Sequence, residues 1–210
     1  ISIEARKRYL AASPYNICHL ILGEKNPSDS QDDNRYRSAA KTFQAWLEDQ
    51  ILIRDGHDSI YFYEQQYTLR KEKRIRRGFI ATMRLTKPNI HSHEHTMAGP
   101  KEDRFKLLKE VRANLSPIFV LFEDTQRQIS RIYDNEIKER PAFINITDDS
   151  GTVHKLWRIT DETTLNRLKD NLKTKHIFIA DGHHRYEVAE EFADFMKGRV
   201  KDYTGKEGFN

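Results

Sequence analysis

The sequence predicts an α+β or mixed α/β protein, in which a mixed sheet is flanked by helices and a hairpin is inserted. Short apolar runs rich in β-branched and aromatic residues alternate with amphipathic stretches along the 210 residues. Two strand-like runs, residues 59–69 and 75–85, lie close together and indicate the hairpin. A third run, residues 177–179, reaches a glycine turn and continues into a helical pattern, as in a strand followed directly by a helix.

The N-terminal third alternates between helical and apolar patterns. Ser2 is a suitable N-cap for a short helix within residues 1–12. Residues 16–22 are compact and apolar, which favours a buried strand with Cys18 as a small core residue. The polar residues 26–34 form a loop, and residues 35–52 follow helical spacing with Trp46 on the core side.

The predicted hairpin has a basic tip, where Arg70, Lys71, Lys73 and Arg74 are close in sequence. Such a cluster raises the question of nucleic-acid binding. Residues 70–77 contain no aromatic side chain between the charges, and a basic turn is most often simply solvated. The sequence therefore does not support nucleic acid as a partner.

Residues 87–104 form a chemically dense stretch. His91, His93 and His95 alternate, so an extended backbone places them on one face and Glu94 on the other. Gly99-Pro100 then starts a helix.

The remaining elements are assigned from apolar runs and turn signals. The patterns predict strands at residues 114–122, 141–147 and 153–159, a weak helix at 126–136, and a polar helix capped by Thr160 and ending at Leu172.

Two consecutive regions follow from this order of elements. Residues 1–86 form an N-terminal α/β region with the hairpin, and residues 87–210 contain both histidine-rich motifs. Because the chain lacks an initiating Met and stops after a glycine-rich run, we expect a fragment of a longer protein.

Composition limits the class of protein. The chain is 37% hydrophobic and 32% charged, with a net charge of +4, a mild bias that suits anionic small-molecule ligands. Cys18 is the single cysteine, which excludes an internal disulfide and favours a reducing cytoplasm. No apolar run is long enough for a membrane span, so we expect a cytoplasmic protein with no membrane partner; its oligomeric state stays open.

The segment Asp181-Gly182-His183-His184-Arg185 carries the strongest functional signal. A helix N-terminus offers unpaired N–H groups and a partial positive charge, and Gly182 lets an anion approach the main chain. Two histidines and an arginine stand at the same point, whereas a simple N-cap would explain only Asp181. This pattern predicts a phosphate-binding turn.

These residues resemble known families. Residues 181–187, D-G-H-H-R-Y-E, are similar to the phosphate-binding box of the ParB/sulfiredoxin superfamily, which implies a related phosphate-binding core. Residues 92–96, 99–104 and 114–119 (S-H-E-H-T, G-P-K-E-D-R and N-L-S-P-I-F) resemble the uncharacterised DUF1015 family, and this second resemblance covers nearly the whole chain.

The branches of the superfamily imply different activities. Sulfiredoxins carry a cysteine where His183 stands, and Cys18 lies in a predicted core strand, so reductase chemistry is excluded. Free-serine kinases have a D-G-H-H-R box and an upstream glutamate that acts as base, a position that Glu94 matches in context. ParB proteins use a helix-turn-helix on DNA, and we find none here.

The leading hypothesis is a small-molecule kinase that acts on a serine-like hydroxyl. Its catalytic candidates are Glu94 and His184, and its nucleotide-binding candidates are Asp181, Gly182, His183, His184 and Arg185. The expected ligand is ADP, ATP or CTP, with Mg²⁺ as a companion that Asp181 could hold.

Two alternatives stay open. The same box could serve a ParB-like regulatory module that binds a nucleotide without turnover. Alternatively, three alternating histidines together with Asp181, His183 and His184 could support a metal-dependent hydrolase, although Arg185 would repel the metal; the metal ligands are therefore unknown.

Overall fold

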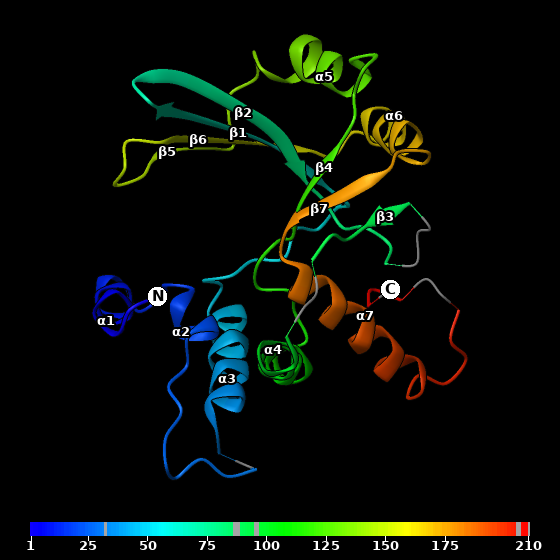
Figure 1. The fold of residues 1–210 in the computed structure, drawn as a ribbon. Coiled ribbons are helices and arrows are strands. Elements are labelled where there is room, and N and C mark those ends of the chain that lie inside the picture. Colours follow the sequence, from blue (N-terminus) through cyan, green and yellow to red (C-terminus); the bar gives the residue numbers. More distant parts are fainter. Residues whose placement is uncertain (32, 86–88, 95–96, 205–206, 210) are drawn as a thin grey trace. The chain divides into compact units, whose positions relative to one another are not determined.

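The computed structural model describes residues 1–31, 33–85, 89–94, 97–204 and 207–209. It is a mixed α+β fold with two sheets and flanking helices, shown in Figure 1. The helices are α1 (Ile3–Ala12), α2 (Cys18–Ile21), α3 (Arg35–Glu48), α4 (Ala98–Val111), α5 (Gln128–Ile132), the π-helical η1 (Tyr133–Ile137), α6 (Glu162–Leu172) and α7 (His183–Lys197). The strands are β1 (Ile60–Leu69), β2 (Glu72–Ile80), β3 (Ile90–His91), β4 (Phe119–Phe122), β5 (Ile144–Thr147), β6 (Val153–Ile159) and β7 (Ile177–Asp181).

The chain divides into two compact units that interleave along the sequence. The first unit consists of Ile1–Arg54, Ser92–Val120 and Ile179–Asn210, and the second consists of Asp55–His91 and Leu121–Phe178. The sequence analysis expected two consecutive regions meeting at residue 86. Because β4 and β7 each begin in one unit and end in the other, no single cut separates the units.

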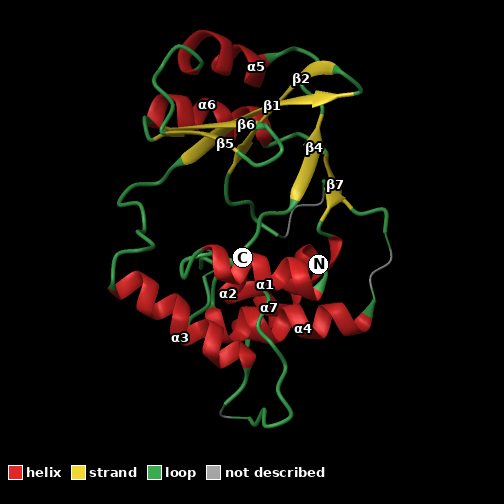
Figure 2. Ribbon diagram, turned by 90° about the vertical axis from the view of Figure 1, so that its left-hand side faces the viewer, coloured by secondary structure: helices red, strands yellow, loops and turns green. Residues whose placement is uncertain are grey.

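The second unit is built on a four-stranded antiparallel sheet in the order β2-β1-β6-β5. Helices α5 and α6 lie on the same side of this sheet in Figures 1 and 2. They cover a core made of buried side chains from β1, β6, α5, η1 and α6, including Phe62, Ile132, Trp157, Ile159 and Leu168. Burial of this apolar area is the main force that holds the unit together.

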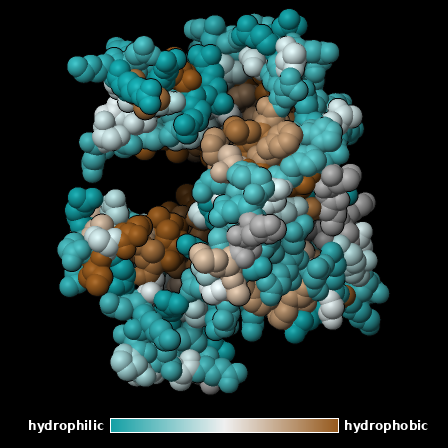
Figure 3. All heavy atoms as spheres, in the orientation of Figure 1, coloured by the Kyte–Doolittle hydropathy of each residue, from teal (hydrophilic) through white to brown (hydrophobic). Residues whose placement is uncertain are grey.

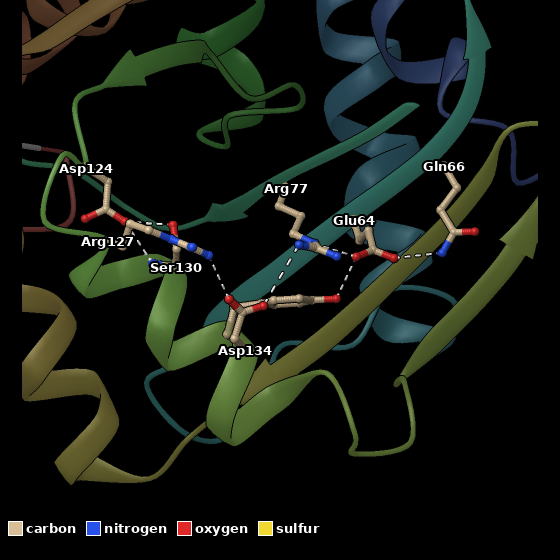
Figure 4. A network of polar contacts seen from close by, with 8 residues as sticks. Glu64, Gln66, Arg77, Asp124, Arg127, Ser130 and Asp134 are labelled. Atoms are coloured by element: carbon tan, nitrogen blue, oxygen red, sulfur yellow. Dashed lines mark hydrogen bonds and ion pairs between the residues drawn. The ribbon is translucent and has the colours of Figure 1, made fainter. Parts of the chain in front are cut away.

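A carboxylate stands at one core position of β1. Ile60, Phe62 and Glu64 alternate toward the helices, and Glu64 is 4% exposed. Its carboxylate accepts hydrogen bonds from Arg77 Nε at 2.8 Å, Tyr133 Oη at 2.7 Å and Gln66 Nε2 at 2.8 Å (Figure 4). Burial by itself raises the pKa of Glu64, but these three donors outweigh burial and hold the pKa below its ordinary value. The buried charge is therefore fully partnered.

The predicted hairpin is confirmed, with shifted boundaries. Arg70 and Lys71, with φ of 51° and 70°, form the turn, and Leu69 pairs with Glu72. A two-residue turn with both φ values positive matches the twist of paired strands, so β2 begins at Glu72, three residues earlier than predicted, and it ends at Ile80.

Helix α1 in the first unit is confirmed, including Ser2 as its N-cap, and helix α3 is confirmed with its last residue at Glu48. The predicted strand at residues 16–22 is wrong: the segment contains helix α2. The side chain of Asn16 accepts from Cys18 N–H at 3.0 Å, which starts a helical turn in place of extended backbone. Cys18 and Trp46 are buried, as expected.

Several other boundaries differ from the predictions, including the helix expected at residues 126–136, which consists of α5 and η1 over residues 128–137. Only Phe119–Phe122 of residues 114–122 is a strand, and β5 begins at Ile144. Asp161, rather than Thr160, caps α6, because its carboxylate accepts from Thr164 N–H at 2.9 Å.

The second sheet has the order β3-β7-β4, and β3 pairs with β7 in parallel through Ile90–Ile177 and His91–Phe178. The sequence predicted one mixed sheet, whereas the structure has two sheets, of which the larger is antiparallel and the smaller contains this parallel pair. Hydrophilic residues predominate on the face shown in Figure 3. Within the described ranges, no helix combines the length and apolar character that a membrane crossing requires.

Candidate functional site

The turn between β7 and α7 consists of one residue, Gly182, with φ of 95°. An L-residue rarely adopts this left-handed backbone, and a Cβ at this position would lie 2.8 Å from Arg185 Nη2. The dihedral angle therefore favours glycine, and a larger residue would also have to displace the Arg185 guanidinium. The predicted order of strand, glycine turn and helix is confirmed, although α7 starts at His183 rather than at Arg185.

Arg185 folds back over this turn. One of its amino groups, Nη2, bonds Asp181 Oδ2 at 2.5 Å, and Nη1 donates to Ser116 Oγ at 3.2 Å and to the Pro117 carbonyl. The Arg185 side chain is 27% exposed and that of Asp181 is 72% exposed. Asp181, which was expected as a possible magnesium ligand, bonds Arg185 in this structure, and a positive charge covers Gly182.

His183 is buried at the start of α7, with 2% of its side chain exposed. Its Nδ1 lies 3.0 Å from Glu94 Oε2, and its ring packs edge to face with His93 at a centroid distance of 4.7 Å. Its Nε2 is buried and makes no hydrogen bond within the part of the chain that the structure describes. Glu94 and the D-G-H-H-R turn, which are far apart in the sequence, therefore meet in space.

His184 contacts the start of α4. Its Nε2 accepts from the Met97 main-chain N–H at 3.1 Å, and Met97 is the N-cap residue of that helix, without a capping hydrogen bond from its own side chain. Because Nε2 accepts, the neutral imidazole carries its proton on Nδ1. His184 can therefore donate to a phosphate only through Nδ1.

Helices α4 and α7 pack together and hold these contacts in place. Leu108, Val188 and Phe192 form their buried cluster, and Lys101 Nζ lies 2.9 Å from Glu187 Oε2. The two helices lie side by side in Figures 1 and 2. Since α4 follows Glu94 and α7 carries His183, this packing brings the carboxylate to the imidazole.

The alternating histidines do not share one face in the described residues. Strand β3 ends at His91, whose Nε2 lies 2.7 Å from His176 Nδ1 in the second unit, whereas His93 packs on His183 in the first. His95 lies outside the described residues. Among the described residues, no group of three His, Cys, Asp or Glu side chains is arranged to hold a metal ion.

Four residues contact the predicted site residues in ways that the sequence did not indicate, and His93 among them was expected only as a possible metal ligand. Ser116, Pro117, His93 and Met97 hold or pack against the predicted site residues. Ser116 and Pro117 belong to the N-L-S-P-I-F segment that supported the family resemblance, and this was the one available signal of their importance.

The fold and this turn define a mixed α+β protein with an arginine-covered glycine turn at a helix start. The chain belongs to the DUF1015 family, described as "Protein of unknown function (DUF1015)", whose family model matches residues 1–210. Searches of curated proteins and of solved structures found no match.

Proposed function

We propose that the turn Asp181 to Arg185 binds the phosphates of a nucleotide, within a ParB/sulfiredoxin-like core. We further propose that the protein transfers a phosphoryl group to the hydroxyl of a small, serine-like acceptor. The observation that supports this proposal most is the contact of 3.0 Å between Glu94 Oε2 and His183 Nδ1. It brings a candidate base beside the candidate phosphate site.

Charge and backbone geometry favour an anion at this turn. The first helical hydrogen bond of α7 runs from Tyr186 N–H to the Gly182 carbonyl at 3.0 Å, so the N–H groups of residues 183–185 precede the helical bonding pattern. The 15-residue helix adds a partial positive charge at its N-terminus, and the Arg185 guanidinium lies at the same place. Phosphoryl transfer depends chiefly on such charge neutralisation and positioning.

Glu94 has the exposure that a general base needs. Its side chain is 56% exposed, so the carboxylate is fixed on one side by buried His183 and accessible on the other. In the proposed reaction the acceptor hydroxyl gives its proton to Glu94. The acceptor oxygen then forms a bond to the γ-phosphorus of ATP, and the bond between this phosphorus and the bridging oxygen of the departing ADP breaks.

His184 and Arg185 have supporting roles in this scheme. His184 Nδ1 donates to a phosphate oxygen while Nε2 keeps its contact with Met97. Asp181 supplies the carboxylate of the turn, and this carboxylate already bonds Arg185. Mg²⁺ would therefore bind at the turn only together with the nucleotide phosphates. Magnesium commonly binds through one or two carboxylates together with substrate phosphates, and bound there it neutralises phosphate charge. ATP, ADP and CTP are the candidate nucleotides.

A regulatory module is the second candidate, and the contacts of Arg185 favour it. This residue ties the turn to Ser116 and the Pro117 carbonyl. A phosphate that draws the guanidinium away would release the segment before β4, so nucleotide binding would be sensed without turnover.

A turnover assay separates the two candidates. The full chain is incubated with ATP and magnesium, with and without serine and related hydroxyl compounds, and phosphorylated product is measured. We expect product with the wild type, and none with Glu94→Gln, which should still bind the nucleotide. Glu102→Gln is the matched control, because Glu102 is also exposed and pairs with Lys106 on the surface of α4. Normal turnover by Glu94→Gln would overturn the assignment of the base, and nucleotide binding without product from any acceptor would favour the regulatory module.

A further inference from the structure

Three titratable side chains are linked by hydrogen bonds in the second unit, on the sheet face opposite α5 and α6. Tyr63 Oη lies 2.6 Å from His154 Nδ1, and His154 Nε2 lies 3.0 Å from Asp148 Oδ2. Because Glu64 faces the helices, its neighbour Tyr63 faces the other way, and His154 shares that face through its pairing with Gln65. The Tyr63 and His154 rings are nearly parallel, with 12° between their planes.

The hydrogen bonds determine which of these groups donates a proton and which accepts one. An ionised carboxylate only accepts, so Nε2 of neutral His154 donates to Asp148 and Nδ1 accepts the Tyr63 hydroxyl proton. The other Asp148 oxygen accepts from Ser150 N–H, Ser150 Oγ and Thr152 N–H at 2.9, 2.6 and 3.0 Å. The bonds from Ser150 and then from His154 hold the pKa of Asp148 well below its ordinary value. The carboxylate is therefore charged at neutral pH and accepts four hydrogen bonds.

We propose that Asp148, His154 and Tyr63 form a reactive centre in which Tyr63 Oη is a nucleophile toward an uncharged acyl ester. Its geometry places a nucleophile, a base and an orienting carboxylate in sequence, the arrangement that activates a hydroxyl for acyl transfer. Burial raises the pKa of Tyr63, so the free phenolate is scarce at neutral pH and His154 must take the proton as the bond forms.

The proposed acyl transfer needs no reactant other than these three groups, the ester and water. Tyr63 Oη bonds to the acyl carbon, the bond from that carbon to the leaving oxygen breaks, and the phenolic proton passes to His154 Nδ1. The same nitrogen then protonates the leaving oxygen. Water, deprotonated by His154, hydrolyses the tyrosine ester and restores Tyr63.

Two guanidinium groups near these residues are bound to carboxylates. Arg74 bonds Glu72, and Arg158 bonds Asp55 at 2.8 Å, so both charges are compensated. Phosphoryl transfer needs cations that neutralise charge on several oxygens, whereas acyl transfer develops a single oxyanion. The compensation of these two cations therefore favours an uncharged acyl ester over a phosphorylated substrate.

Acetylation by p-nitrophenyl acetate tests this centre on the full chain. Intact mass and peptide mapping measure acetyl groups at Tyr63 and at Tyr67, a tyrosine on the same strand and face that contacts no histidine among the described residues. We expect Tyr63 to react at least ~100-fold faster than Tyr67, the lower range of general-base assistance. His154→Gln should bring the two rates together, and Tyr63→Phe should remove the fast phase.

Asp148 is a positioning residue, and its test is the pH profile of the reaction. Asp148→Asn should slow acetylation and move the midpoint of the pH–rate profile to lower pH, because the carboxylate no longer stabilises the imidazolium. Loss of a purely structural contact would not move this midpoint.

Equal rates at Tyr63 and Tyr67 in the wild type would overturn the proposal, whatever the folding of the variants. An unchanged Tyr63 rate in folded His154→Gln would overturn it as well.

Discussion

The Glu94 carboxylate lies 3.0 Å from Nδ1 of buried His183, at the first residue of α7. A solvent-accessible acid is thus anchored beside a glycine turn that a guanidinium covers. This relationship joins two motifs that are distant in the sequence, and it makes the phosphotransfer proposal specific enough to test.

Arg185→Ala should weaken nucleotide binding about 10- to 100-fold, since a hydrogen bond to a charged group contributes ~1.5–3 kcal/mol. Titration calorimetry of the folded variant measures this loss. Arg6→Ala is a matched control, because Arg6 also bonds a main-chain carbonyl, that of Leu22, and a carboxylate, that of Glu24. If both variants lose affinity equally, the effect is one of folding and the assignment of Arg185 fails.

Gly182→Ala should destabilise the protein more than Gly151→Ala. Both glycines have positive φ, 95° and 80°, so each alanine carries a backbone cost of ~1–2 kcal/mol. Only at Gly182 would the new Cβ lie 2.8–2.9 Å from the guanidinium of Arg185, whereas nothing lies within 4 Å at Gly151. Urea unfolding of both variants measures the difference, and equal losses would show that the guanidinium does not pack against the turn in solution.

Glu64→Gln should reduce stability at neutral pH by ~1.5–3 kcal/mol, the contribution of hydrogen bonds to a charged group. The folded-state pKa of Glu64 is lowered, so its stabilising effect is complete above the pKa of the unfolded chain, about 4.3, and is lost as pH falls through the folded value. The wild type and the variant should therefore converge in acid.

Urea unfolding from neutral to acidic pH tests this convergence. Glu72→Gln provides the control, because Glu72 is 65% exposed and pairs with Arg74 at the hairpin turn, where an ion pair contributes little. A stability gap between wild type and Glu64→Gln that persists in acid would contradict the role given to the charge.

His184→Ala should speed hydrogen exchange at the Met97 amide, because the imidazole is its acceptor. Loss of one such bond corresponds to ~1 kcal/mol. His19→Ala, which removes a ring that contacts the Ser13 carbonyl, should leave that amide unchanged. Identical Met97 exchange in the wild type and His184→Ala would show that this contact does not form in solution.

Local signals in the sequence predicted much of the fold. Asp181-Gly182 after an apolar run predicted the strand, turn and helix, because only glycine adopts the backbone that the turn requires without strain. The strand predicted at residues 16–22 was wrong, because a short apolar run fits a buried helix as well as a strand. The hydrogen bond from Cys18 N–H to the Asn16 side chain favours the helix there.

The contacts of the candidate site were less predictable. Glu94 was connected to the turn only through a family resemblance, and the packing of α4 against α7 supplies the physical link. The fold-back of Arg185 depends on Ser116 and Pro117, which belong to a separate segment, so no local pattern reveals it. The roles of these residues in binding and catalysis stay predictions.

Titration calorimetry of the full chain with ATP, ADP, CTP and pyrophosphate, each with magnesium, tests the central claim most directly. The account predicts saturable binding of at least one nucleotide at one site per chain, and its loss on Arg185→Ala. Absence of heat and of thermal stabilisation with all four ligands would contradict a phosphate site at Gly182.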